Sequence, residues 1–445
     1  MIVMETNKTV LNKILIITYY WPPSGGGGVQ RWVKFCKYLP EYGFEPIVLT
    51  VAPSDASYTL IDHSLEKEIS ADLKVYTTKS VESLQLFMKL FGRKKLPHSG
   101  FSGENKATFF SKCSRFVRGN FFIPDPRKGW NKFAQEKAVQ LIKEHSIKYV
   151  ITTSPPHSTQ LIGSYLKKRC AIEWFADLRD PWTDIYYYND LMHTSIARKI
   201  DAKYELEVLE QADQVLVVSP AIQRLFASKI TESKREKINV LPNGYDEQDV
   251  EVFPRSSSPV NQFVITYTGN LASNYPGDVF LNVLKQLIDQ NPAVKIIFRF
   301  VGVFPTQLND LIHTLQLETS IEHIEYVEHS QVFKYLNTSD ALFLAIPEAK
   351  NNEGILTGKL FEYLATNKPI VCIGPPHGDA AAILHSCSIG KTFDRGQEKA
   401  ALTYLQALVE AHQQTRHYFS KTDVYKKYSR KNLTKELVEL MLAKK

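Results

Sequence analysis

The sequence predicts an α/β protein built from two tandem domains, each with a parallel sheet. Strand patterns rich in β-branched and apolar residues alternate with helix patterns along nearly the whole chain. A Ser- and Pro-rich stretch at 251–261 interrupts the alternation and is typical of a linker. A chain of 445 residues is also too long for one ordinary hydrophobic core. We therefore expect Rossmann-like domains at 1–250 and 251–425, and a terminal segment at 426–445.

The first half opens with a strand, a glycine turn, a helix that stops before Pro40, and a second strand. Such a βαβ unit predicts parallel strands joined by a right-handed crossover. The strands are expected at 13–20, 44–51, 149–154, 171–178, 214–219 and 237–244. The later helices are expected at 133–145, 158–169, 195–212 and 220–227.

The second half repeats the pattern after the linker, so ligands are expected in a crevice at the carboxyl ends of its strands. Its strands are expected at 263–270, 295–302, 321–327, 341–346 and 369–374. Its helices are expected at 279–288, 306–315, 330–337, 357–365, 379–386 and 431–444.

Composition and charge limit the partners and the cellular location that we expect for the protein. A formal charge of +7 suits anionic ligands, but no nucleic-acid motif accompanies it, so nucleic acid is not an expected partner. Five cysteines without a C-x-x-C pair, a polar N-terminus and no apolar run of membrane-spanning length favour a cytoplasmic protein. Basic and aromatic residues interleave at 83–128. This stretch predicts either peripheral contact with the inner membrane face or an ordinary insertion whose aromatic residues enter the core.

The turn Gly25, Gly26, Gly27 and Gly28 lies between a strand and a helix. Glycines there let a ligand approach the backbone, and the helix N-terminus offers free N–H groups. The dinucleotide fingerprint is broken because Gln30 stands where a third glycine is needed, which argues against an NAD enzyme. We expect an acceptor or phosphate loop, with a purely structural turn as the alternative.

The segment FADLRDPWTD places Asp177, Arg179 and Asp180 at a predicted carboxyl strand end. A carboxylate there can take a proton from an acceptor hydroxyl, and Arg179 can pair with an anionic substrate. The alternative is an Arg–Asp pair that fixes a loop. His157 follows another strand and is a further catalytic candidate, although a lone histidine is weak support.

In the second half, Gly269, Asn270 and Ser273 form the first strand-to-helix turn, where backbone amides can meet a pyrophosphate. A capped turn explains Ser273 equally well. Further on, Lys359 and Glu362 lie three positions apart, hence on one helical face. Lys359 can meet phosphate and Glu362 can accept hydrogen bonds from two ribose hydroxyls, whereas the alternative is a surface ion pair.

These motifs resemble the family-4 glycosyltransferases of the GT-B fold over most of the chain. The segments that carry the resemblance are ILIITYYWPPSGGGGVQR, LPNGYD, TYTGN, TGKLFEYLATNKPIV and YSRKNLTKEL. The resemblance implies two domains facing a central cleft, a last helix that crosses back onto the first domain, and a ribose contact from Glu362. It also implies a retaining hexosyltransferase that needs no metal and no cofactor besides its nucleotide-sugar substrate.

The sequence departs from the family pattern at two places. Many members have a donor-sugar glutamate eight positions before the ribose-binding one, but Gly354 stands here, with Glu353 beside it. A shifted loop would let Glu353, Glu348 or a backbone amide make that contact. The usual Arg and Lys of the first turn are replaced by Asn270 and Asn274, so phosphate neutralisation would depend more on Lys359.

The sequence thus predicts transfer of a sugar from a nucleotide-diphosphate sugar to a hydroxyl of a carbohydrate or lipid-linked acceptor, in the synthesis of a cell-surface polysaccharide or glycoconjugate. Two alternatives stay open. One is a GT-B-like nucleotide-sugar epimerase, which would release nucleotide without an acceptor. The other is a non-catalytic nucleotide-sugar-binding protein on the same fold.

Overall fold

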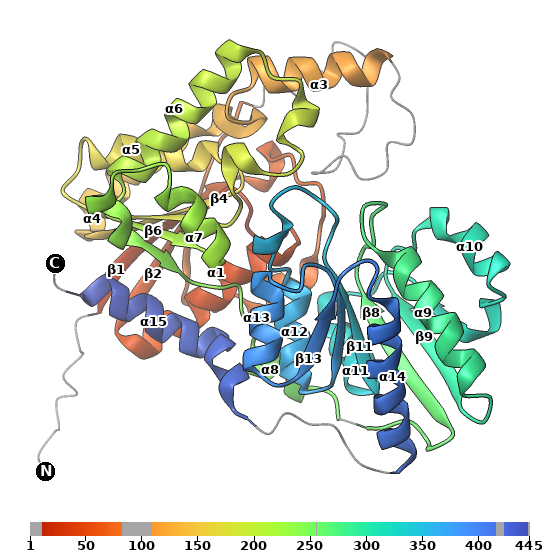
Figure 1. Ribbon diagram of the computed structural model, residues 1–445. Helices are drawn as coiled ribbons and strands as arrows, with labels where there is room; N and C mark the ends of the chain where they lie inside the picture. Colours follow the sequence, from red (N-terminus) through yellow and green to blue (C-terminus); the bar gives the residue numbers. More distant parts are fainter. Residues whose placement is uncertain (1–10, 82–108, 255, 415–421, 444–445) are drawn as a thin grey trace, which may run out of the picture.

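The computed structural model describes residues 11–81, 109–254, 256–414 and 422–443, and within them the chain forms two fully parallel sheets (Figure 1). The first sheet has seven strands in the order β3-β2-β1-β4-β5-β6-β7, and the second has six in the order β10-β9-β8-β11-β12-β13. The predicted pair of Rossmann-like parallel-sheet domains is therefore confirmed. Helices cover both faces of each sheet, which is why the central strands are apolar on both sides.

The first sheet takes its strands and helices from the N-terminal half. Its strands are β1 (Asn12–Ile17), β2 (Phe44–Val51), β3 (Lys74–Thr78), β4 (Tyr149–Ser154), β5 (Glu173–Leu178), β6 (Gln214–Val217) and β7 (Ile238–Val240). The helices are α1 (Gly27–Tyr38), α3 (Phe109–Phe121), α4 (Asn131–His145), α5 (Ser158–Lys167), α6 (Ser195–Gln211), α7 (Pro220–Ala227) and the short α8 (Glu247–Glu251).

The second sheet lies in the C-terminal half. Its strands are β8 (Gln262–Thr268), β9 (Lys295–Val301), β10 (Ile321–Ile324), β11 (Ala341–Ala345), β12 (Ile370–Ile373) and β13 (Gly390–Phe393). The helices are α9 (Gly277–Gln290), α10 (Asn309–Thr314), α11 (His329–Asn337), α12 (Gly358–Thr366), α13 (Asp379–Ser386), α14 (Glu398–Gln413) and α15 (Arg430–Leu442).

Strand order fixes where each domain can bind a ligand. The chain leaves β1 toward β2 on one side, and later returns to pair β4 with the other side of β1; β8 has the same place between β9 and β11. In open parallel sheets the loops diverge at such a reversal and leave a crevice at the carboxyl ends of the strands. The glycine turns after β1 and β8 lie at these two points.

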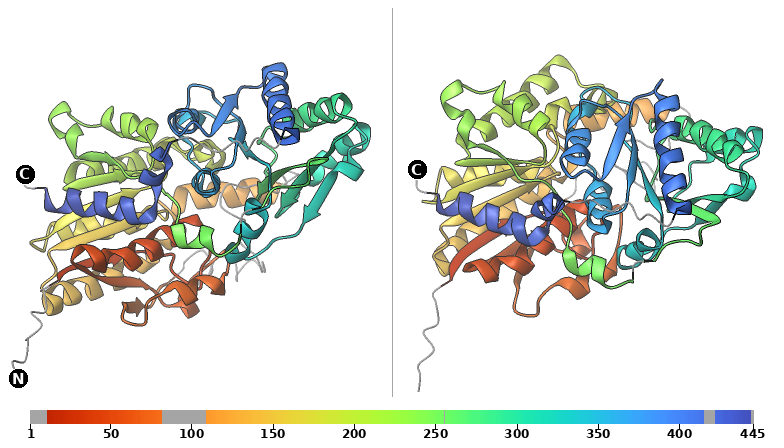
Figure 2. Two further views of the ribbon diagram at one scale, coloured as in Figure 1. Left: turned by 90° about the horizontal axis from the view of Figure 1, so that it is seen from below. Right: turned by 60° about the horizontal axis from the view of Figure 1, so that its bottom comes forward.

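The last described helix crosses back to the first domain. Leu433, Leu437 and Met441 of α15 are buried in one cluster with Trp32 and Phe35 of α1. Figures 1 and 2 show α15, in deep blue, lying against the red N-terminal elements. The two domains are therefore joined by the segment after β7 and by this returning helix.

Polar contacts fix the segment after β7 to α1 and join α7 to the second domain. Lys34 of α1 is almost fully buried and forms ion pairs with Glu68, Asp246 and Asp249, at 2.8 to 2.9 Å. Asp379, at the start of α13, accepts a hydrogen bond of 2.8 Å from the backbone N–H of Ala221 at the start of α7. A carboxylate at a helix N-terminus is favourably placed, so this contact links α7 to the second domain.

Candidate functional site

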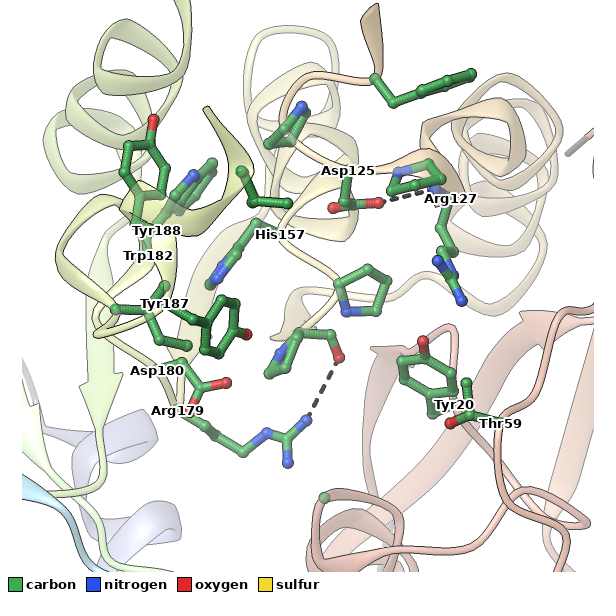
Figure 3. Close-up of a pocket in the computed structure, with 18 of the residues that line it drawn as sticks. Tyr20, Thr59, Asp125, Arg127, His157, Arg179, Asp180, Trp182, Tyr187 and Tyr188 are labelled. Carbon is green, nitrogen blue, oxygen red and sulfur yellow. Dashed lines mark hydrogen bonds between the residues drawn. The ribbon is translucent and has the colours of Figure 1, made fainter. Parts of the chain in front are cut away.

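Two adjoining cavities open at the carboxyl ends of the first sheet's strands. The N-terminal cavity, of about 480 Å³, lies within the first domain, between the glycine turn after β1 and the segment after β5. The interdomain cavity, of about 490 Å³, lies between that segment and residues 347–356 of the second domain. Arg179, Asp180, Ile185 and Tyr186 line both cavities, so the segment after β5 lies between them. Figure 3 shows the N-terminal cavity, with Arg179 and Asp180 at its edge.

The glycine turn after β1 faces the N-terminal cavity, which Gly25, Gly26 and Gly28 help to line. Helix α1 begins at Gly27 with no side-chain cap, so its first N–H groups are not used by a capping residue. A Cβ on Gly28 would lie 1.8 Å from Nη1 of Arg179. A side chain here would displace the guanidinium of Arg179, which lies directly on the backbone, so the turn and Arg179 form one cationic surface.

Arg179 is held by backbone carbonyls rather than by an acid. Its Nε donates to Ser154 O at 3.0 Å and its Nη2 to Pro155 O at 3.4 Å. Within the described ranges no carboxylate lies at ion-pair distance from it. Its positive charge, beside an uncapped helix N-terminus, makes the junction of the two cavities suited to an anion.

Asp177 does not take the catalytic position expected for it. Its carboxylate is fully buried, pairs with Arg31 at 3.0 Å, and accepts hydrogen bonds from Trp32 Nε1 at 2.9 Å and Thr153 Oγ1 at 2.7 Å. It lines neither cavity. The reason is that β5 continues to Leu178, so Asp177 is an inward-facing strand residue that fastens α1 to the sheet. An Arg–Asp pair is therefore present, as in the alternative interpretation, but it joins Asp177 to Arg31 and not to Arg179.

Asp180 follows the end of β5 and lines both cavities. No described residue donates a hydrogen bond to its carboxylate. Burial raises the pKa of Asp180, and the charge of Arg179 partly offsets that effect. A partly buried carboxylate with a raised pKa can accept a proton from a hydroxyl group or orient that group.

His157, just before α5, also faces the N-terminal cavity. Its ring stacks on Trp182 with centroids 4.6 Å apart, and its Nδ1 is buried with no hydrogen-bond partner among the described residues. Burial, and then the charge of Arg179, lowers the pKa of His157 to about 3. The imidazole is therefore neutral near pH 7 and can exchange hydrogen bonds with a ligand without carrying charge.

The turn after β8 is arranged differently from the sequence prediction. Gly269 has φ +92°, and a Cβ there would lie 2.7 Å from Cε of Lys359. Asn270 and Ser273 are exposed, and Ser273 lines a small separate hollow beside Glu348 and Arg395. Neither of these two residues lines the interdomain cavity. Helix α9 begins only at Gly277, so Ser273 does not cap it.

Lys359 lies on the inner side of this turn. Its Nζ is 5.1 Å from the ring centroid of Tyr267, and it forms no ion pair within the described ranges. Burial lowers the pKa of Lys359, and the charges of Tyr275 and Glu362 act in the opposite direction. Tyr275 lines the interdomain cavity, whereas Lys359 lines neither cavity, and its ammonium group has no ion-pair partner in the described part of the chain.

Glu362 is held by a histidine that the sequence analysis did not identify. His329, at the start of α11, donates from Nε2 to Glu362 Oε1 at 3.1 Å, and both side chains are mostly buried. Burial would raise the pKa of Glu362, but the hydrogen bond and charge of His329, with the charges of Lys359 and Arg430, lower it overall. Lys34 of the first domain is also electrostatically coupled to His329. The carboxylate therefore lies at the domain boundary as an anion.

The loop at 352–354 explains the departure from the family pattern. Gly354 is buried, and a Cβ there would lie 2.9 Å from Cβ of Ala221 in α7. No side chain fits at this position because the first domain packs against it. Glu353 is exposed and lines the interdomain cavity, so it is the carboxylate that this loop presents to the cavity.

The basic-aromatic stretch is only partly a surface feature. Its residues 83–108 lie outside the described ranges. Trp130, just past its end, is fully buried and donates from Nε1 to Thr78 Oγ1 at 2.8 Å, and Arg127 is only 7% exposed. Phe121 of α3 is 75% exposed. The surface interpretation therefore does not hold for Pro126 and Arg127, which are buried in the short 3-10 helix Pro126–Trp130, whereas Lys128 is exposed.

Two further features concern the residues that the structure describes. None of their helices has the length and apolar composition required to cross a bilayer. Their His, Cys, Asp and Glu side chains form no group of three or more that could hold a metal ion.

Comparison with known proteins gives one partial relative by sequence. No family model matches the chain. A protein of Bacillus subtilis (strain 168), whose assigned name is teichuronic acid biosynthesis glycosyltransferase TuaH, is 20% identical over 198 residues. The match covers 44% of this chain and spans about half, 49%, of that relative.

Solved structures match nearly the whole chain. Anabaena Alr3699/HepE, solved with UDP-glucose, is 14% identical with a TM-score of 0.59, covering 96% of this chain and 99% of its own. S. aureus TarM, solved as a variant with fondaparinux, alpha-GlcNAc-glycerol and UDP, is 12% identical with a TM-score of 0.62, covering 97% and 100%. The N-terminal domain of Candida albicans trehalose-6-phosphate phosphatase matches at 12% identity and a TM-score of 0.59, covering 98% of this chain and 97% of its own.

At such identities the likeness concerns the fold, and the fold alone does not fix the reaction. The chain has the GT-B fold, the two-domain architecture of its glycosyltransferase neighbours.

Proposed function

We propose that the protein is a glycosyltransferase that moves a sugar from a nucleotide-diphosphate sugar to a hydroxyl of a carbohydrate or lipid-linked acceptor. The observation that carries the proposal is Arg179, an arginine with no carboxylate partner in the described chain, placed at an uncapped helix N-terminus where the two cavities meet. Such a point suits a diphosphate with the donor on one side and the acceptor on the other. HepE bound to UDP-glucose and TarM bound to UDP and carbohydrate support the same assignment.

Charge stabilisation is the main task of the proposed site. As the glycosidic bond to the diphosphate breaks, negative charge grows on the leaving group. Arg179, Lys359 and the first N–H groups of α1 would stabilise that charge, and Asp180 would orient the acceptor hydroxyl and take its proton. Cationic side chains in these positions can do this without a metal. A retaining outcome belongs to the proposal through the family resemblance.

The donor nucleoside is assigned to Glu362, whose carboxylate would accept hydrogen bonds from the ribose hydroxyls. A thermal-shift panel of UDP-, GDP-, CMP- and dTDP-sugars tests this, because a bound ligand raises Tm by simple linkage. We expect one nucleotide class to raise Tm, and Glu362→Gln to lose most of that increase.

The matched control is Glu318→Gln, since Glu318 pairs with His313 at 2.8 Å in the same domain but is exposed. If Glu362→Gln keeps the full increase, the ribose assignment is wrong. Product analysis with a radiolabelled sugar then separates the functions: transfer to an acceptor supports the proposal, and an epimerised sugar or binding without turnover supports one of the two alternatives.

We also propose contact with an anionic membrane surface through the junction of α3 and α6, which would place the enzyme at the inner membrane face. Asn120 of α3 hydrogen-bonds the backbone at Met192 and Thr194, which brings the two helices together. Exposed apolar side chains gather there, with Phe121 75%, Ile196 72% and Met192 45% exposed. The exposed Arg198, Lys199 and Lys203 lie beside them on α6. Apolar residues beside basic ones suit acidic headgroups.

Flotation with phosphatidylglycerol vesicles and with neutral vesicles tests this contact. We expect the protein to float with the anionic vesicles alone, and Phe121→Ser with Ile196→Ser to abolish flotation. Val303→Ser, a change at an exposed apolar residue of the other domain, should leave it unchanged. Equal flotation of the double variant and the wild type would refute this contact surface.

A further inference from the structure

The N-terminal cavity contains a second cation that the function above does not use. Arg127 is 7% exposed and lines this cavity together with Arg179. Its Nη2 donates to Ser57 O at 3.3 Å, while its Nε is buried with no hydrogen-bond partner in the described chain. Figure 3 shows Arg127 and Arg179 entering the same opening from different elements. A largely buried guanidinium with an unused donor is costly unless an anion meets it.

Two acids that line the cavity, Asp125 and Asp201, are hydrogen-bonded to groups other than the guanidinium of Arg127. Asp125 accepts hydrogen bonds from the backbone N–H groups of Arg127 and Ser158, at 2.9 and 2.7 Å, and from Ser158 Oγ at 2.8 Å. Asp201 accepts from Trp182 Nε1 at 2.8 Å and from Tyr188 OH at 2.9 Å. Both carboxylates are thus occupied by neutral donors. Within the described ranges neither forms an ion pair with an arginine.

A third arginine, Arg118 of α3, increases the positive charge of this wall. It lines the same cavity, and burial followed by the charge of Arg127 lowers its pKa. An arginine beside a cavity suits a phosphate or carboxylate, because its planar group of donors matches two oxygens of the anion.

The opposite wall of the cavity is aromatic. His157 stacks on Trp182, and Tyr188 stacks on His193 with centroids 4.2 Å apart. Tyr20 and Tyr187 complete the lining, and Figure 3 shows Tyr187 between His157 and Asp180. Flat apolar faces with a few convergent polar atoms, in a volume of about 480 Å³, suit a small ring-shaped ligand.

We infer that the acceptor bound in the N-terminal cavity is an anionic sugar, with a phosphate or carboxylate group held by Arg127 and its ring against the aromatic wall. The inference rests on the proposed function. It adds the chemical class of the acceptor whose hydroxyl Asp180 would contact. The anion is either the carboxylate of a uronic acid or the phosphate that links a sugar to a carrier.

Ligand-observed NMR titrations of the full chain, saturated with UDP, test the inference. The probes are methyl glucuronide, glucose 1-phosphate and the neutral methyl glucoside. We expect at least one anionic sugar to bind about tenfold more tightly than methyl glucoside, as one well-placed ion contact provides. The two anionic probes separate the carboxylate from the phosphate. Equal affinities for all three sugars would overturn the inference.

The variant that isolates the contact is Arg127→Gln, which should abolish the preference for the anionic sugar and leave UDP binding unchanged. Arg127→Lys keeps the charge and should restore part of the preference, and it also serves if the Gln variant folds poorly. The control is Arg235→Gln, because Arg235 likewise donates to a backbone carbonyl, Ala227 O at 3.0 Å, but at the surface. An unchanged preference in Arg127→Gln would refute the site. A retained preference in the wild type without any UDP binding would instead refute the donor assignment alone.

Discussion

Each domain has a glycine turn at the equivalent position, after β1 and after β8, but different groups surround the two turns. In each turn a cation from a distant element lies against a glycine: Arg179 from the end of β5 on Gly28, and Lys359 from α12 on Gly269. After the first turn α1 begins at once, without a side-chain cap. After the second, α9 begins only at Gly277. The first turn thus offers an anion both a guanidinium and a helix N-terminus, whereas the second offers an ammonium group.

This difference indicates that the first domain contributes more to anion binding than a division into acceptor and donor domains suggests. A diphosphate bound to Lys359 would also contact Arg179 only when the two domains come together. Donor binding and domain closure would then be coupled, because the charge is neutralised by groups from both sides of the cleft.

The largest expected effect is on the stability of the protein, and it concerns Asp177, which holds the helix that follows the first turn. Arg31 of α1 is fastened to the sheet through the buried carboxylate of Asp177. Asp177→Ala leaves a buried arginine without its partner, so we expect the free energy of unfolding, measured in urea, to fall by about 3–5 kcal/mol. Asp180→Ala, three residues away, should change stability by less than about 1 kcal/mol and reduce transfer instead. A stable but inactive Asp177 variant would reverse our assignment of the two residues.

A smaller effect is expected from adding a methyl group to each turn. Gly269→Ala forces alanine to a positive φ, which costs about 1–2 kcal/mol, and it also crowds Lys359. Gly28→Ala meets only the mobile end of Arg179, so its cost should stay below about 1 kcal/mol while sugar transfer falls. Thermal unfolding and initial rates on both variants check this order. If Gly28→Ala is the less stable variant, the arginine is rigidly held and the comparison fails.

The smallest effect is a dependence of stability on pH through His329 and Glu362. The pKa of His329 is raised above 6.5, so its stabilisation is complete below that pH and is lost as the pH rises through the raised pKa. The pKa of Glu362 is lowered below 4.5, so its contribution is present above pH 4.5 and is lost as the pH falls through the lowered pKa. The pair should therefore contribute most between pH 4.5 and 6.5.

Urea unfolding of the wild type and His329→Gln across pH 4 to 9 measures that contribution. We expect a difference of about 1 kcal/mol inside the window, which shrinks at higher pH. His313→Gln, which removes the exposed His313–Glu318 pair, should show a weaker dependence. A difference that is constant from pH 5 to 9 would mean that the His329 pair does not titrate as described.

Most of the fold could be predicted from the sequence because the buried strands are continuous apolar runs. All residues of β4 and β11 are buried, and both were recognised. The edge strand β3, Lys74–Thr78, was missed because its side chains are exposed or half-buried, so it lacks an apolar run and gains its order by pairing with β2.

The site was predicted less completely, since its decisive contacts join residues far apart in the chain. Asp177 and Asp180 look alike in FADLRDPWTD, and only the partner Arg31, 146 residues away, separates their roles. His329 lies 33 residues from Glu362, and no local pattern connects them. For the stretch that contains Arg127 the sequence left a membrane-facing surface and an ordinary insertion open, because no local pattern shows that this side chain is buried beside Asp125, which caps the 3-10 helix.

The returning helix α15 also has a consequence for how the molecule is made. The apolar face of α1, with Trp32 and Phe35, is covered by Leu433, Leu437 and Met441. Those residues are translated after every strand of both sheets, and domains generally fold in the order in which they leave the ribosome. The apolar face of α1 in the first domain therefore stays uncovered in the nascent chain until the second domain has been synthesised.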